Sequence, residues 1–176
     1  MPDENRRFAE GQRRFVSGGR DSVLKQYEEE DSAEKIAKLI AGYVVQIAQE
    51  NSVDAKQHLY ELLLDDKLIE IVDSVLQQIK LSEVDPCSYL HRFALLTAQK
   101  SPDRGPVKFA IALLGMIGDI NDRETISLLG RHEEFTLYVA VALEKMLDDP
   151  SDDWWGLAQR VDGWGKIHLV RRLVPT

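Results

Sequence analysis

Apolar residues recur every three or four positions along most of the chain, and this spacing constrains the fold more than any other feature. In the stretch from Ser32 to Glu50 the apolar residues include Ile36, Leu39, Ile40, Tyr43, Val44 and Ile47. Residues that are three, four and seven positions apart lie on one face of an α-helix. Sustained alternation of apolar and polar residues, which is typical of strands, is not found. The chain is therefore predicted to be all-α, without a β-sheet.

The same spacing predicts eight or nine helices joined by short polar segments. They cover residues 32–50, 53–64, 67–79, a stretch after Asp85-Pro86, residues 107–118, a short segment around Ile126, and residues 135–147, 154–161 and 166–174. Asp31 or Ser32 is predicted to cap the first of these helices, and Asn121 and Asp122 to cap the short one. Pro106 fits a first helical turn, where its missing amide hydrogen costs nothing.

The length of 176 residues is enough for one domain with a sizeable core. Residues 21–176 are predicted to form a single helical domain, and residues 1–20 a basic N-terminal arm or first helix. The basic and aromatic residues of this arm are Arg6, Arg7, Phe8, Arg13, Arg14, Phe15 and Arg20. A helix whose two phenylalanines close the open end of the helical stack is the favoured interpretation. A nucleic-acid-binding arm or a docking helix is the alternative.

The acidic balance of the chain argues against several classes of partner. Its formal net charge is -8, which disfavours generic binding to nucleic acid or to an anionic membrane. No apolar run approaches the ~20 residues that span a bilayer, and residues 1–15 lack the apolar segment of a secretory signal. The single cysteine, Cys87, is predicted to be a buried small apolar residue. The expectation is a cytoplasmic protein without a cofactor.

An internal repeat is present in the second half of the chain. The segment AIALLGMIGD at 110–119 matches AVALEKMLDD at 140–149, with alanine, leucine, methionine and aspartate at equivalent positions. A looser third copy, KIHLVRRLVP, begins at Lys166. Small alanines followed by leucine suit a helix that packs closely on both sides. The repeat predicts helical units that stack on their neighbours.

These segments resemble the HEAT-repeat family, whose pattern is V-x-x-A-x-x-A-L-G-x-I-G-D followed by a short helix with paired leucines. The matching segments here are VKFAIALLGMIGD, RETISLLGRH, FTLYVAVALEKMLDD and WWGLAQRV, and the resemblance is clear over residues 106–174. The stretch DGWGKIHLVRRL is similar to one in bacterial HEAT-like proteins of unassigned role. The resemblance implies an α-α superhelix of four to five helix pairs whose curved inner surface faces a partner.

Catalytic and metal-binding patterns are weak. Neither a phosphate-binding glycine loop nor a serine-nucleophile motif is found. His58 and Glu61 lie one helical turn apart, but a metal site needs a second such pair. His132-Glu133 resembles the His-Glu pairs of HEAT-repeat hydroxylases that bind two irons, yet those enzymes need several pairs. Isolated histidines such as His91 are expected to be packed or surface residues.

An acidic loop follows the second copy of the repeat. Its carboxylates are Asp148, Asp149, Asp152 and Asp153. The spacing is not that of a calcium-binding EF-hand loop, and no central glycine is present. We interpret these residues as helix caps and as favourable charges at a helix N-terminus. No catalytic, cofactor or metal residue is therefore predicted for the chain.

All three tryptophans lie between residues 154 and 164, close to several basic residues. The candidate partner-binding residues are Trp154, Trp155, Arg160, Trp164, Lys166, His168, Arg171 and Arg172. Aromatic residues beside arginine are typical of protein-interaction hot spots. The competing interpretation is that the tryptophans fill the last layer of the core.

The leading functional hypothesis is a non-enzymatic scaffold or adaptor that binds a protein or peptide. A HEAT-like DNA glycosylase is one alternative, because Asp152, Trp154, Trp155 and Arg160 supply residue types that such an enzyme uses. A homo-oligomeric structural component, in which the open ends of the helical stack meet, is the other alternative.

Overall fold

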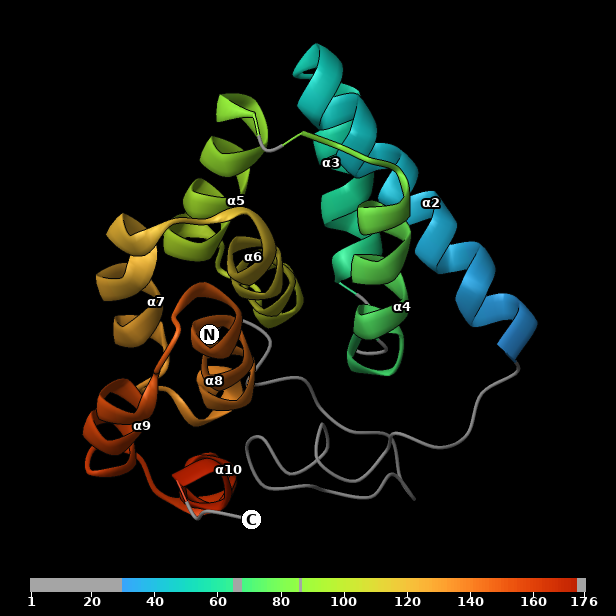
Figure 1. The fold of residues 1–176 in the computed structure, drawn as a ribbon. Coiled ribbons are helices and arrows are strands. Elements are labelled where there is room, and N and C mark those ends of the chain that lie inside the picture. Colours follow the sequence, from blue (N-terminus) through green and yellow to red (C-terminus); the bar gives the residue numbers. More distant parts are fainter. Residues whose placement is uncertain (1–29, 65–67, 86, 174–176) are drawn as a thin grey trace.

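The computed structural model describes the backbone of residues 30–64, 68–85 and 87–173 (Figure 1). Over these residues all regular elements are helical, which confirms the predicted all-α class. The helices are α2 (Glu30–Glu50), α3 (Val53–Leu63), α4 (Leu68–Leu81), α5 (Ser88–Lys100), α6 (Arg104–Ile117), the 3-10 turn η2 (Ile120–Asp122), α7 (Arg123–Leu129), α8 (Glu133–Met146), α9 (Ser151–Ala158) and α10 (Gly163–Leu173). The predicted N-terminal arm of residues 1–20 lies outside the described residues.

Two predicted helix starts are wrong. Asp31 and Ser32 lie inside α2 and therefore do not cap it. Helix α5 begins at Ser88 rather than at Asp85-Pro86, because the sulfur of Cys87 accepts a hydrogen bond from the Leu90 amide at 3.4 Å. Cys87 is half-buried, and its thiol donates to the Ala48 carbonyl at 3.1 Å. This cysteine is thus a cap that ties the start of α5 to α2, rather than a simple buried apolar residue.

The repeated segments fall in α6 and α8, which pack directly against each other. Lys108 of α6 lies 3.0 Å from Glu134 of α8, and Gly115 of α6 lies against Ala142 of α8. The earlier residue of α6 thus contacts the earlier residue of α8, and the later residue contacts the later one, so the two helices run parallel. Figure 1 shows α6, α8 and α10 nearly end-on, with α5, α7 and α9 beside them.

Helix α10 continues this arrangement on the other side of α8. A side chain at Gly165 would meet Thr136 of α8, and Arg172 lies 3.7 Å from Glu144 of the same helix. These contacts again advance in the same direction, so α8 and α10 are also parallel. Three parallel helices in a row are what stacked repeat units require. A superhelical path for the whole chain remains a prediction.

The core follows the register of the repeat. The equivalent leucines Leu113, Leu143 and Leu169 are each fully buried. Gly115 permits the closest approach of α6 to α8, since a Cβ atom there would lie 2.7 Å from the Ala142 Cα. A side chain at this position cannot be accommodated without moving one of the helices. The repeat seen in the sequence is therefore a packing repeat.

Candidate functional site

The candidate partner-binding residues come from α9 and α10, and the structure separates them into buried and exposed groups. Trp154 is only 7% exposed, and its indole N–H donates to the Ala140 carbonyl at 3.1 Å. The next residue, Trp155, is 60% exposed. Trp154 therefore belongs to the core and is not available to a partner, whereas Trp155 is.

One face of α10 is open to solvent. Its exposed residues are Lys166, Ile167, Val170 and Arg171, and we call this set the outer face of α10. The two apolar members, Ile167 and Val170, are 41% and 44% exposed. Gly165 and Leu169, on the other side of the same helix, are buried where α10 packs against α8 and α9.

The charge of α10 is entirely positive, because the segment Gly163–Leu173 contains lysine and arginine and no acidic residue. Arg172 turns toward α8, with its Nε atom 3.7 Å from a Glu144 oxygen. Lys166 lies 3.8 Å from Asp162, whose side chain is 90% exposed. Such a solvent-exposed pair contributes little to stability and leaves the lysine able to engage another carboxylate.

Trp164 and His168 lie one turn apart along α10, and both are half-buried. Their ring centroids are 6.4 Å apart and the planes are inclined by 38°. Burial lowers the pKa of His168, and the positive charges of Arg172 and Arg171 lower this pKa further. The lowered pKa favours the neutral imidazole. Arg160 of the preceding segment donates to the Gly156 carbonyl at 2.7 Å and remains exposed.

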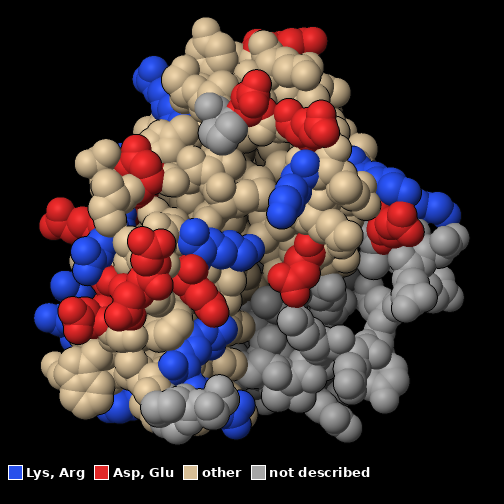
Figure 2. All heavy atoms as spheres, viewed as in Figure 1, with Lys and Arg blue, Asp and Glu red and all other residues tan. Residues whose placement is uncertain are grey.

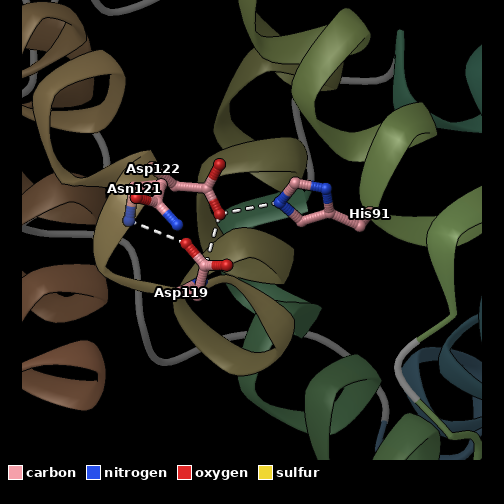
Figure 3. A network of polar contacts seen from close by, with 4 residues as sticks. All are labelled: His91, Asp119, Asn121 and Asp122. Atoms are coloured by element: carbon pink, nitrogen blue, oxygen red, sulfur yellow. Dashed lines mark hydrogen bonds and ion pairs between the residues drawn. The ribbon is translucent and has the colours of Figure 1, made fainter.

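A second polar site joins residues that the sequence analysis treated separately (Figure 3). The carboxylate of Asp122 accepts a hydrogen bond from the Asp119 amide at 3.1 Å and lies 2.7 Å from Nε2 of His91. Asp119 in turn accepts from the Asn121 amide at 2.7 Å. Asp122 stands at the predicted N-cap position of α7, but its side chain makes no cap hydrogen bond to that helix.

The His91–Asp122 pair resembles the acid–base dyads of enzymes, but the thiol of the single cysteine is bonded to another group. The thiol of Cys87, one helical turn before His91, donates to the carbonyl of Ala48 instead. The pair links α5 to the turn between α6 and α7, so we assign it a structural role. The capping box Asp119–Asp122 is visible in the sequence as two acids three positions apart. Nothing in the sequence points to His91 as its partner.

The other candidate ligands also have structural roles. His132 caps α8 by accepting from the Glu134 amide at 3.3 Å, and His58 stacks on Tyr43 at 5.7 Å. In the acidic loop, Asp149 accepts from the Ser151 amide at 2.9 Å. Asp153 of α9 holds Arg123 of α7 through two contacts of 2.9 Å. Within the described part of the chain, no three potential ligands come together as a metal site would require.

An ionic cluster between α6 and α8 was not predicted. Glu134 has a side chain that is only 10% exposed, and it lies 3.0 Å from the Lys108 ammonium and 3.4 Å from Arg104. Lys108 also lies over the Tyr138 ring at 5.6 Å. Residues 26 to 30 positions apart in sequence give no local signal for such a contact. The cluster joins the first turns of α6 and α8.

Charged side chains on the drawn face are mixed in sign. Figure 2 shows acidic and basic residues side by side over α7, α8 and α9, whereas the region over α5 and α6 is mostly uncharged. A continuous basic path, which a nucleic-acid-binding groove needs, is not seen on this face. Within the described residues, no helix has the combined length and hydropathy to cross a bilayer.

No protein family, curated protein or solved structure matches this chain. The resemblance to HEAT repeats therefore stays a prediction from the residues of 106–174.

Proposed function

We propose that this chain is a helical interaction module that binds a protein or peptide through its C-terminal unit, α9 and α10. The observation that carries the proposal is the outer face of α10, where Ile167 and Val170 are 41% and 44% exposed between Lys166 and Arg171. Apolar side chains that form a row bounded by charges mark interaction surfaces more often than single exposed residues do. HEAT-like stacking and a cytoplasmic location accompany this proposal as predictions.

The size of the available apolar area supports binding of useful strength. Burying a side chain such as isoleucine or valine is worth roughly 1.5–3 kcal/mol. Trp155, which is 60% exposed on the adjacent helix, adds a residue type that is enriched in binding hot spots. Partial burial before binding reduces these gains, and association has its own entropic cost, so the three side chains anchor a complex without fixing its affinity.

The glycosylase alternative receives less support. It requires tryptophans that stack on a base, but Trp154 is buried and bonded to Ala140. Arg160, which follows α9, is engaged with the Gly156 carbonyl of that helix. The mixed charges over α7, α8 and α9 also offer no continuous path for phosphates (Figure 2).

Site-specific photo-crosslinking in the cells that make the protein tests the proposal. A photoreactive amino acid replaces Ile167, and a control chain carries it at Val53, an exposed residue of α3. Helix α3 lies at the opposite end of the structure from α10 (Figure 1). We expect a discrete adduct from position 167 that is lost when Val170→Asp is added. The absence of an adduct at position 167, or the same adducts at both positions, would contradict the proposal.

A further inference from the structure

The outer face of α10 indicates what kind of partner fits it. Helix α8 has a parallel helix on each side, α6 and α10, whereas among the described residues the main neighbours of α10 are α8 and α9. The side of α10 that faces away from α8 carries Ile167 and Val170, three positions apart. Apolar residues at this spacing form a ridge into which the side chains of another helix fit.

The charges that border this ridge specify the partner further. Lys166 precedes Ile167, and Arg171 follows Val170, so a basic residue stands at each end of the apolar pair. The weak, exposed contact of Lys166 with Asp162 does not cancel the positive charge beside Ile167. A docked helix is therefore favoured by acidic residues beside its apolar stripe and disfavoured by basic ones.

Neither α10 nor α2 of a second copy satisfies these charges. Two α10 helices facing each other would place Lys166 and Arg171 of both copies together. The exposed apolar pair Ile36 and Leu39 on α2 is itself bordered by lysines, and the nearest acid, Glu34, is already held by Lys38 at 2.6 Å. Like charges would meet in either contact, which is destabilising.

We infer that the partner is an acidic amphipathic helix of another protein, and that it docks along the outer face of α10. This inference rests on the proposed function and names the chemistry of its ligand. Ile167 and Val170 supply the apolar contact, while Lys166 and Arg171 select acidic flanks. Lysines would reduce the affinity at the same flanks, so the surface discriminates by charge as well as by shape.

Fluorescence anisotropy with designed peptides tests the inference on the full chain. Three labelled peptides of about 20 residues are needed: one with a leucine stripe and glutamate flanks, one with the same stripe and lysine flanks, and one with the acidic composition in scrambled order. We expect the acidic amphipathic peptide to bind at least about tenfold more tightly than either of the others. Its affinity should fall as salt is raised, because the selecting charges are exposed.

Charge reversal on α10 provides the matched variants. Arg171→Glu combined with Lys166→Glu should weaken the binding of the acidic peptide by about tenfold or more and strengthen the binding of the lysine-flanked peptide. Lys38→Glu on α2, which changes the net charge in the same direction at a distant exposed site, should leave the preference in place. Thermal unfolding of each variant establishes that the fold is retained.

The outcomes separate this inference from the proposed function. Equal binding of the three peptides, or no binding by any, together with a discrete adduct at position 167, overturns the inference and leaves the interaction module standing. A dimer in light scattering that Ile167→Asp abolishes overturns it as well, because a second copy is then the occupant. Loss of the crosslinked adduct itself would instead contradict the proposed function.

Discussion

Nε2 of His91 lies 2.7 Å from an oxygen of Asp122, a carboxylate whose side chain is only 5% exposed. The two residues are 31 positions apart and join α5 to the turn before α7. The next residue, Arg123, reaches in turn to Asp153 of α9. Two adjacent residues at the start of α7 therefore connect this region to α5 on one side and to α9 on the other. These contacts hold α9 in place, and α10 packs against α9.

The first prediction concerns the Asp122 carboxylate. Asp122→Ala should lower the free energy of unfolding by about 3 kcal/mol, because it leaves His91 and the Asp119 amide without their buried acceptor. Asp119→Ala is the matched control, since Asp119 is exposed and its carboxylate accepts from backbone amides of its own turn, and it should cost about 1 kcal/mol. Urea denaturation measures both variants. Equal losses would show that the buried pair has no special role.

The two neighbouring tryptophans provide a second prediction. Trp154→Ala should destabilise the protein by roughly 3–5 kcal/mol, because it removes a buried aromatic ring and its hydrogen bond to Ala140. Trp155→Ala should change the stability by less than about 0.5 kcal/mol, since this side chain is exposed. Calorimetry distinguishes the two cases. A large loss of stability for Trp155→Ala would mean that this residue is part of the core and not of a binding surface.

Glycine positions offer a third test, which addresses the packing of the repeat. Gly115→Ala should lower the free energy of unfolding of the protein by about 1–3 kcal/mol, because the added methyl group would overlap Ala142 between α6 and α8. Gly42→Ala is the control, because nothing lies within 4 Å of a Cβ atom at this exposed position of α2. This control should stabilise by about 0.5–1 kcal/mol through helix propensity. Tolerance of alanine at Gly115 would contradict the close parallel packing of the repeated helices.

A fourth prediction follows from the lowered pKa of His168, whose causes are burial and then the charges of Arg172 and Arg171. Because the unfolded chain then binds the proton more readily than the folded one, stability falls as pH decreases through about 6.5. His168→Gln should remove this part of the pH dependence. The titration of the His168 imidazole by NMR should have its midpoint below 6.5, and Arg172→Gln should raise it. A wild-type midpoint at or above 6.5 would contradict the account.

The helices were predictable because their signal is local. Spacings of three and four residues reveal a buried stripe without knowledge of what covers it, and the repeat reveals which helices are equivalent. The ends of helices were less predictable, because several groups compete for each cap. At α5 the sulfur of Cys87 caps the helix, although the sequence offers Asp85 as the conventional residue.

The contacts between helices were beyond local reasoning. His91 with Asp122, and Lys108 with Glu134, join positions that only the packed chain brings together. The tryptophan cluster is visible in the sequence, but the adjacent residues Trp154 and Trp155 of α9 lie in opposite environments. Only the packing of α9 against its neighbours determines that Trp154 is buried and that Trp155 is exposed.

The most direct test of the central claim, that the outer face of α10 is the binding surface, is amide hydrogen exchange of the full chain. Exchange is measured with and without a saturating amount of the crosslinked partner or of the acidic helical peptide. The account predicts slower exchange concentrated in Gly163–Leu173, with α2 to α5 unchanged. Protection that falls on other helices and spares α10 would contradict the claim.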